Sequence, residues 1–306
     1  GNISPNTSIN PSGVLTVALD ETTDTLTVTA TSALDKRKSS TAIIKVSNIC
    51  QVGAVGYATL DDALTAVKAN GGGTIKLLAN INYYESIIID GISVTFDLNG
   101  YTLSVKSDIP LNHALKVVNG GKQLLYGDGE FKAVSASDGF GIMADNNSII
   151  EVTNVEAYFG VVANNGSIIT VRKDIINRSS SFYYTGAFGA KASGGSIINI
   201  GGSILTLNSN EIYMNNPGAI IEGSGSINIA GDVKVTDASI GVKIEGSGSI
   251  YVGGDIIQDR SLRPCAEING SGIIIIDGVC KILEPNNSGK IRINGSDRSG
   301  VPGESP

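Results

Sequence analysis

The sequence is poor in the side chains that carry most enzyme chemistry. Its 306 residues include no Trp, one His and three Cys, and only 5% are aromatic and 17% charged. The apolar residues, 41% of the chain, are mostly Ile, Val, Leu and Ala in short runs that Gly, Asn and Ser interrupt. Such runs favour many short β-strands over amphipathic helices. The composition therefore excludes a helical bundle and predicts an all-β protein.

Charge and hydropathy exclude two further classes. The 22 basic and 29 acidic residues give a net charge of −7 without any basic cluster, so we expect no nucleic-acid partner. The sequence has no run of about 18 apolar residues, so we expect no membrane span in it. It opens on a polar, turn-rich stretch instead of a Met, and we expect it to be a piece excised from a longer protein.

The cysteines favour free thiols. Cys50, Cys265 and Cys280 are odd in number and include no Cys-x-x-Cys pair, which argues against a disulfide framework and against a zinc site. We interpret them as reduced, partly buried thiols, and a single bond between Cys265 and Cys280 is the alternative. We expect no cofactor, with calcium as the one ion that the acidic residues could bind.

Residues 1–49 form a segment of their own. Short alternating runs at 14–17, 26–30 and 42–46 predict three antiparallel strands with polar turns between them. The stretches 12–17, 20–22, 26–32 and 38–42 resemble the C-terminal half of a bacterial Ig-like repeat of the group 2 type. The resemblance implies a partial Ig-like β-sandwich segment, of a kind found in bacterial surface proteins and in some phage virion proteins.

The one helix that the sequence predicts covers residues 59–70. Thr59 and Asp62 form an N-terminal capping arrangement, and Gly71 provides a left-handed stop. One face of this helix carries an apolar stripe of Leu60, Ala63, Leu64 and Val67. A single amphipathic helix before a long β region is expected to act as a cap.

From residue 74 onward an apolar-x-apolar strand recurs. Its first members are Ile75, Val94, Leu124, Ile150, Ile169, Ile198, Ile227, Ile250, Ile274 and Ile291. The mean step of 24 residues is typical of one turn of a parallel β-solenoid, here with three strands per coil. Coils stack about 4.8 Å apart, so about ten coils would make a rod roughly 45 Å long. Parallel crossovers are right-handed, and we therefore expect a right-handed parallel β-helix over residues 50–295.

Residues 52–295 resemble the pectin-lyase-like superfamily of right-handed parallel β-helices. The likeness is most specific in 57–63, 72–79 and 96–103, which are similar to the cap helix and first coils of bacterial cell-surface members. The resemblance implies an extracellular protein, secreted or on the cell surface, but this fold alone says little about activity. Residues 296–306 are polar and contain Gly and Pro, and we interpret them as a tail or linker.

Residues for catalysis are sparse. A lyase of this superfamily needs carboxylates that hold Ca²⁺ and an Arg or Lys base beside them. The residues that come nearest are Arg260, Arg263, Asp255, Asp259 and Glu267, which we interpret as parts of a solvated loop. A hydrolase would need clustered Asp residues near a His, and the single His113 has no such neighbours in the sequence.

Two carboxylates occupy equivalent positions in adjacent coils. Glu222 and Glu245 lie in the similar stretches 221–225 and 244–248, which predicts a separation of about 5 Å along the rod. Like charges so close either repel each other in water or share a cation, and calcium is the natural candidate. Exposed turns tolerate such repulsion, and this is the alternative that we favour.

The extra residues of the longer coils indicate a binding surface. They are predicted to fall before the Gly-led strands, in Val105–His113, Lys132–Gly139, Asn177–Ala187 and Thr206–Pro217, and so to line one face of the rod. The aromatic residues there and near the cap are Phe182, Tyr183, Tyr184, Tyr213, Tyr83 and Tyr84. These rings either stack on sugars or proteins, or pack down over the coils. Phe140, Phe159 and Phe188 are predicted to form a ladder in the core.

These features favour a non-catalytic module of an extracellular bacterial surface protein. The rigid β-helix would present its loop-rich face to a glycan or to a host or cell-surface protein. One alternative is a polysaccharide lyase or glycoside hydrolase that acts on acidic polysaccharide. A further alternative is a component of a phage tail or spike.

Overall fold

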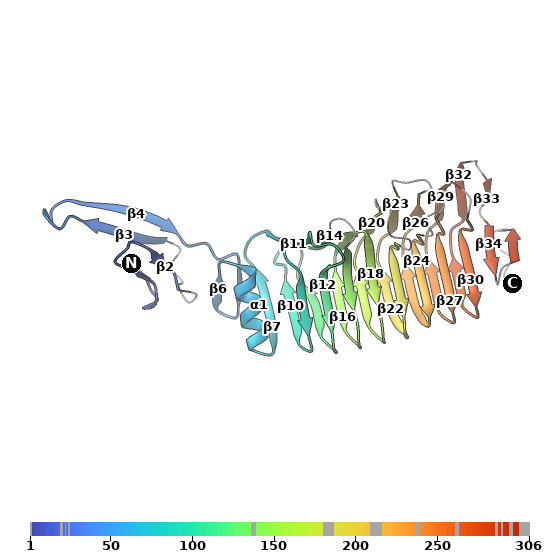
Figure 1. Ribbon diagram of the computed structural model, residues 1–306, viewed down its shortest axis with the longest axis horizontal. Helices are drawn as coiled ribbons and strands as arrows, with labels where there is room; N and C mark the ends of the chain where they lie inside the picture. The colour runs from blue at the N-terminus through green and yellow to red at the C-terminus, as the bar shows by residue number, and fades with distance from the viewer. Residues whose placement is uncertain are drawn as a thin grey trace.

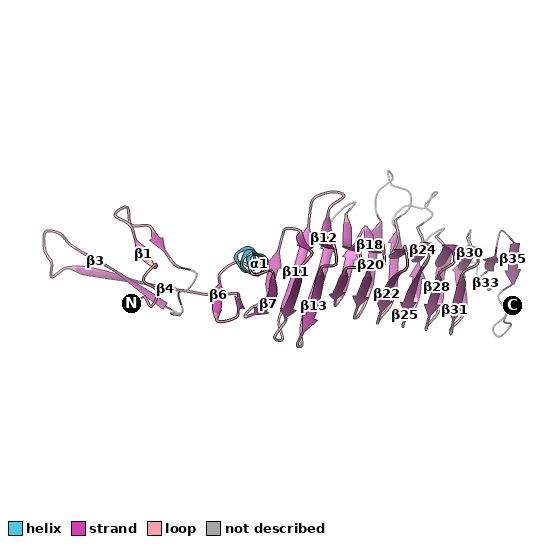
Figure 2. Cartoon of the chain, turned by 90° about the horizontal axis from the view of Figure 1, so that it is seen from below, coloured by secondary structure: helices cyan, strands magenta, loops and turns pink. Residues whose placement is uncertain are grey.

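The protein forms a solenoid of three long sheets, labelled here A, B and C (Figures 1 and 2). The computed structural model describes residues 2–18, 21, 23, 25–135, 139–179, 187–208, 216–236, 239–260, 263–284, 287–288, 290–293 and 296–299. The chain runs from sheet A to sheet B to sheet C once per coil, and equivalent strands of adjacent coils pair in parallel. This confirms the predicted all-β parallel β-helix.

Each sheet collects every third strand of the solenoid, and the antiparallel strands β5, β6, β33 and β35 lie at the ends of the sheets. Sheet A contains β5 (Cys50–Val52), β6 (Val55–Tyr57), β7 (Gly72–Leu77), β10 (Ser93–Asp97), β13 (Lys122–Tyr126), β16 (Ile149–Val152), β19 (Ile168–Val171), β22 (Ser196–Ile200), β25 (Gly225–Ile229), β28 (Ser249–Val252) and β31 (Ile273–Ile276). Sheet B contains β8 (Ile81–Tyr83), β11 (Thr102–Ser107), β14 (Glu130–Ser135), β17 (Asn154–Ala157), β20 (Ile175–Ser179), β23 (Ile204–Asn208), β26 (Val233–Val235), β29 (Ile256–Arg260), β32 (Cys280–Glu284) and β33 (Asn287–Ser288). Sheet C contains β9 (Ile87–Asp90), β12 (His113–Val118), β15 (Phe140–Ala144), β18 (Phe159–Ala163), β21 (Ala190–Ser193), β24 (Ala219–Gly223), β27 (Val242–Gly246), β30 (Ala266–Gly270), β34 (Lys290–Ile293) and β35 (Ser296–Ser299).

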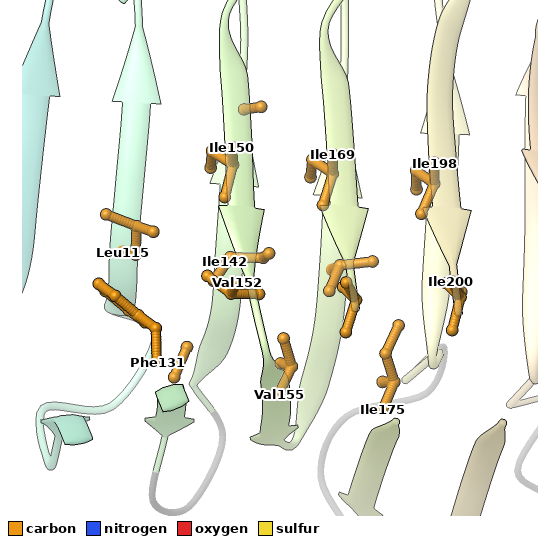
Figure 3. Close-up of a cluster of buried hydrophobic side chains, with 14 of the residues drawn as sticks. Leu115, Phe131, Ile142, Ile150, Val152, Val155, Ile169, Ile175, Ile198 and Ile200 are labelled. Carbon is orange, nitrogen blue, oxygen red and sulfur yellow. The ribbon is translucent and has the colours of Figure 1, made fainter. Parts of the chain in front are cut away.

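Apolar ladders fill the interior. Ile150, Ile169 and Ile198 occupy the same register in neighbouring strands of sheet A, and all three are fully buried (Figure 3). Successive side chains of a strand point to opposite faces of the sheet, so the neighbours of these Ile residues within each strand point outward. Removing these β-branched side chains from water is the main stabilisation of the rod.

Two details of the predicted repeat are wrong. In β13 the inward residues are Gln123 and Leu125, and Tyr126 is 67% exposed, because the strand is shifted by one residue relative to the expected alternation. Ile291 was expected to begin a strand equivalent to Ile274, but β34 pairs with β30 and belongs to sheet C. A short apolar pair does not by itself show which sheet it joins.

The predicted cap helix is confirmed as α1 (Leu60–Ala69). The side chain of Thr59 accepts a hydrogen bond from the backbone N–H of Asp62 at 3.2 Å, and Gly71 has a φ of 72°. Its apolar stripe is buried against the first strands of the rod. Within the part of the chain that the structure describes, no helix is long and apolar enough to cross a membrane.

The N-terminal segment forms two small antiparallel sheets beyond the helix end of the rod (Figure 1). β3 (Thr25–Thr31) pairs with β4 (Ser39–Lys45), as the alternation predicts. β2 (Leu15–Thr16), however, pairs with β1 (Ser8–Ile9) instead of joining the same sheet. The Ig-like assignment of this segment stays a prediction.

Candidate functional site

The corner between sheets B and C is the one whose length varies most. Its connections are 84–86, 108–112, 136–139, residue 158, 180–189, 209–218, 236–241 and 261–265. The corner between sheets A and B is never longer than the connection 98–101 in the coils described, and the corner between C and A never longer than 145–148. The extra residues therefore precede the strands of sheet C, as predicted, although strands β11, β14, β20 and β23 extend into the predicted loops.

Buried amide side chains hold the base of this corner. Asn177 donates from Nδ2 to the backbone C=O groups of Tyr158 and, at 2.9 Å, of Phe188. Gln258 donates to the C=O of Ser239 at 2.6 Å and of Pro264 at 3.2 Å. Both side chains are fully buried and point inward from sheet B. They bind carbonyl oxygens of the connections that lead to sheet C, and the C=O of Phe188 also accepts from the N–H of Gly160 at 2.9 Å.

These two amides were missed by the sequence reasoning, although a signal was present. Asn177 and Gln258 each follow two Ile residues, at a strand position where the alternation requires an apolar side chain. A polar residue at an inward position must find a hydrogen-bond partner in the interior. Its partners here are the connections that lead to sheet C.

A column of stacked rings lies beside Asn177, which donates to the C=O of Phe188. The ring centroids of His113 and Phe140 are 4.7 Å apart, those of Phe140 and Phe159 4.6 Å, and those of Phe159 and Phe188 5.6 Å. The predicted Phe ladder therefore exists, but Phe159 and Phe188 belong to a second apolar cluster separate from the main core. Burial, together with nearby Lys116, lowers the pKa of His113 to about 4, so the imidazole is neutral at pH 7.

Exposed apolar side chains gather at the same corner in the first two coils. Tyr84 is 61% exposed, Ile109 63% and Leu111 51%, and the ammonium of Lys106 lies 5.7 Å from the centroid of the Tyr84 ring. We call these four residues the corner patch. The register of β8 and β11 places Lys106 beside Tyr84 in the adjacent coil. The patch thus combines a free aromatic ring, aliphatic groups and one positive charge.

Leu111 has an unusual backbone. Its φ is 60°, and every other residue of positive φ in the described part of the chain is Asn or Gly. A left-handed conformation costs an L-residue with a bulky side chain about 1–2 kcal/mol, and such strain is concentrated at functional sites. An exposed Leu in this conformation does not stabilise the fold. Its presence therefore favours a role for the side chain at the surface.

The structure separates the two cap-proximal tyrosines. Tyr83 is half-buried, and its hydroxyl donates to Oδ1 of Asp61 on α1 at 2.6 Å, which ties the first coil to the helix. Burial and this hydrogen bond raise the pKa of Tyr83. Tyr84 is left as the exposed ring. Phe182, Tyr183, Tyr184 and Tyr213 lie outside the described residues.

Glu222 and Glu245 are register neighbours in β24 and β27, as predicted. Each carboxylate has its own lysine partner: Lys191 lies 2.7 Å from Glu222 and Lys243 lies 2.5 Å from Glu245. The positive charge that a shared calcium would supply is thus already present at each carboxylate. Among the side chains that the structure describes, no group of three or more His, Cys, Asp or Glu is placed to hold a metal ion.

The residues considered for lyase chemistry have separate positions. Asp255 accepts from the N–H of Val279 at 3.0 Å and from Lys281 at 2.5 Å, and the lysine lowers its pKa. Arg263 is exposed and follows β29, whereas Asp255 precedes this strand, so about 16 Å of strand separates them. Glu267 accepts from Asn269 at 2.8 Å on sheet C. The structure leaves Asp259 partly buried near the end of β29, and the side chain of Arg260 is not among those described.

Comparisons with models of protein families, with curated proteins and with solved structures gave no match. The candidate site is therefore defined by its geometry. It consists of the corner patch, the aromatic column and the buried amides that bind the connections of the same corner.

Proposed function

We propose that this chain is a non-catalytic binding module of an extracellular bacterial surface protein, and that its B–C corner binds a glycan. The observation that carries the proposal is the corner patch, where variable connections expose apolar groups that the other two corners lack. The likeness to cell-surface β-helices and to Ig-like spacers supports the setting. The sparse supply of catalytic residues supports binding over turnover.

The chemistry of the patch indicates the kind of glycan. The face of the Tyr84 ring can stack on the C–H groups of a pyranose ring. Lys106, directly beside this ring, can pair with a carboxylate on the same sugar. A uronate-containing polysaccharide satisfies both groups.

A glycan array that contains uronate and neutral sugars tests the proposal. We expect binding to uronates, and the variants Tyr84→Ala and Lys106→Gln should each weaken it by at least about tenfold. Tyr126→Ala is the matched control, because Tyr126 is 67% exposed but lies on sheet A, away from the corner. Tyr126→Ala should bind like the wild type.

Three outcomes would overturn parts of the proposal. Equal loss of binding in the Tyr84 and Tyr126 variants would move the site off the corner. Binding to surface proteins but to no glycan would replace the ligand class. Release of unsaturated products from a uronate polysaccharide with Ca²⁺, abolished by Arg263→Ala, would show a lyase instead.

A further inference from the structure

The residue immediately before several sheet C strands faces the first residue of a sheet B strand across a very narrow interior. A Cβ added to Gly189 would lie 2.4 Å from Cγ2 of Ile204. A Cβ added to Gly218 would lie 2.5 Å from Cγ1 of Val233. A Cβ added to Gly241 would lie 2.3 Å from Cγ2 of Ile256. No non-bonded carbon atoms approach so closely. In these three coils, a glycine therefore lies opposite a β-branched residue at the equivalent position.

The terminal coil differs at both positions, because cysteines replace the glycine and the β-branched residue. Cys265 is the register equivalent of Gly241, and Cys280 is the register equivalent of Ile256. Each glycine and its partner are separated by the same number of residues as the two cysteines. In three earlier coils this pair of sites has room for only one side chain, whereas in this coil it holds two thiols.

The spacing of these columns fits a disulfide. A Cγ atom is bonded to its own Cβ at about 1.5 Å, so a Cβ within 2.5 Å of that Cγ is at most about 4 Å from the partner Cβ. Disulfides join Cβ atoms about 3.5–4.5 Å apart. In the structure both thiols are free, and they interact with each other. Two sulfur atoms relieve the crowding at this position when they are bonded.

We propose that Cys265 and Cys280 form a disulfide that closes the terminal coil of the rod. The bond would link the residue just before β30 of sheet C to the first residue of β32 in sheet B, with β30 and β31 inside the closed loop. Solenoids need their end coils protected. The helix α1 covers one end, and the disulfide would hold the other.

The bond forms by exchange with a low-molecular-weight disulfide such as oxidised glutathione. The hydrogen bond from Cys265 lowers the pKa of Cys280, and Cys280 is the more exposed of the two. Its thiolate attacks one sulfur of the glutathione disulfide and releases one glutathione thiolate. Cys265, whose pKa is raised by the hydrogen bond to Cys280 and by burial, then loses its proton to solvent. It attacks the Cys280 sulfur and releases the second glutathione thiol.

The test compares the reduced chain with the chain oxidised under native conditions. Non-reducing digestion and mass spectrometry should find a Cys265–Cys280 cross-linked peptide. Amide hydrogen exchange in β30 and β32 should slow by roughly 100-fold on oxidation, because the closed loop restricts opening of the terminal coil. Exchange in β7 and β10, at the other end of the rod, should stay unchanged.

Two variants keep the test decisive. Cys50→Ser removes the third cysteine, which is buried near the cap, and should respond to oxidation like the wild type. The double variant C265G and C280I restores the Gly–Ile pair of the preceding coil, so it should fold and show no response. Free thiols after native oxidation, or a bond that forms only in denaturant, would overturn the proposal. So would a bond that involves Cys50.

Discussion

The A–B corner and the B–C corner of the same coils differ in how side chains bind their backbone. At the A–B corner, side chains outside the core accept hydrogen bonds from the backbone of the next coil. At the B–C corner, amides inside the core donate to the backbone of the connection. The first arrangement ties each turn to its neighbour and fixes its length, and the second leaves the outer side of the connection free to vary.

The A–B corner carries a continuous polar ladder. Asp174 accepts from the N–H of Ser203 at 2.7 Å, and Ser203 from the N–H of Asp232 at 3.0 Å. Asp232 accepts from the N–H of Asp255 at 2.9 Å, and Asp255 from the N–H of Val279 at 3.0 Å. An inserted residue would break two rungs of this ladder. The comparison teaches that this solenoid accepts insertions at the corner whose connections bind core amide side chains, while only the last residues of those connections pair with the next coil.

The largest effect is expected where the variable corner re-enters the core. Gly218→Ala would place a Cβ 2.5 Å from Val233 and 2.7 Å from the carbonyl oxygen of Gly241. We expect a loss of about 3 kcal/mol in the free energy of unfolding, measured by urea denaturation. Cys265→Ala, compared with the wild type under reducing conditions so that no disulfide contributes, is the control, because this position of the column already has a Cβ, and it should lose at most about 1 kcal/mol. Equal losses would contradict the steric explanation.

The aromatic column should make stability depend on pH. The pKa of His113 is about 4 in the folded chain, against 6.5 for the free side chain, so the unfolded state binds the proton first as the pH falls. Lowering the pH from 7 to 5 should therefore cost about 1–2 kcal/mol of unfolding free energy through this group. His113→Phe continues the ring stack without a titrating group. If the variant lost as much stability as the wild type over this range, the assignment to His113 would be wrong.

The polar ladder is expected to tolerate a change of charge but not the loss of its acceptor. Asp232→Ala removes the acceptor for the N–H of Asp255 and should lower the free energy of unfolding by about 1 kcal/mol in urea melts. Asp232→Asn keeps an acceptor oxygen and should retain most of this stability. An Asn variant as weak as the Ala variant would show that the charge, paired with Lys234 at 3.4 Å, matters more.

The smallest change in stability should come from the corner patch, and in the opposite direction. Leu111→Asn replaces a strained Leu by the residue type found at the other left-handed positions and should raise the free energy of unfolding by about 0.5 kcal/mol. If the patch binds glycan as proposed, the same variant should lower affinity on the array. A variant that is more stable and still binds fully would remove Leu111 from the site.

Part of the candidate site was accessible from the sequence. The lengths of the coils located the variable corner, and Tyr84 was among the expected ligand-binding residues. Ile109 and Leu111 were not recognised, because an apolar residue in a loop resembles one that packs inward. The stacking of His113 on Phe140 was also missed, since nothing in a single coil indicates that a His will meet the ring of the next coil.

The sequence alone determined the coil, its core ladders and the cap helix, because these follow from local alternation and from a repeat of about 24 residues. Only the tertiary structure decided which positions of different coils meet. It placed Cys265 against Cys280, gave Glu222 and Glu245 separate lysine partners, and turned Asn177 and Gln258 inward under the loops. These contacts depend on register between coils, which a pattern within one coil does not contain.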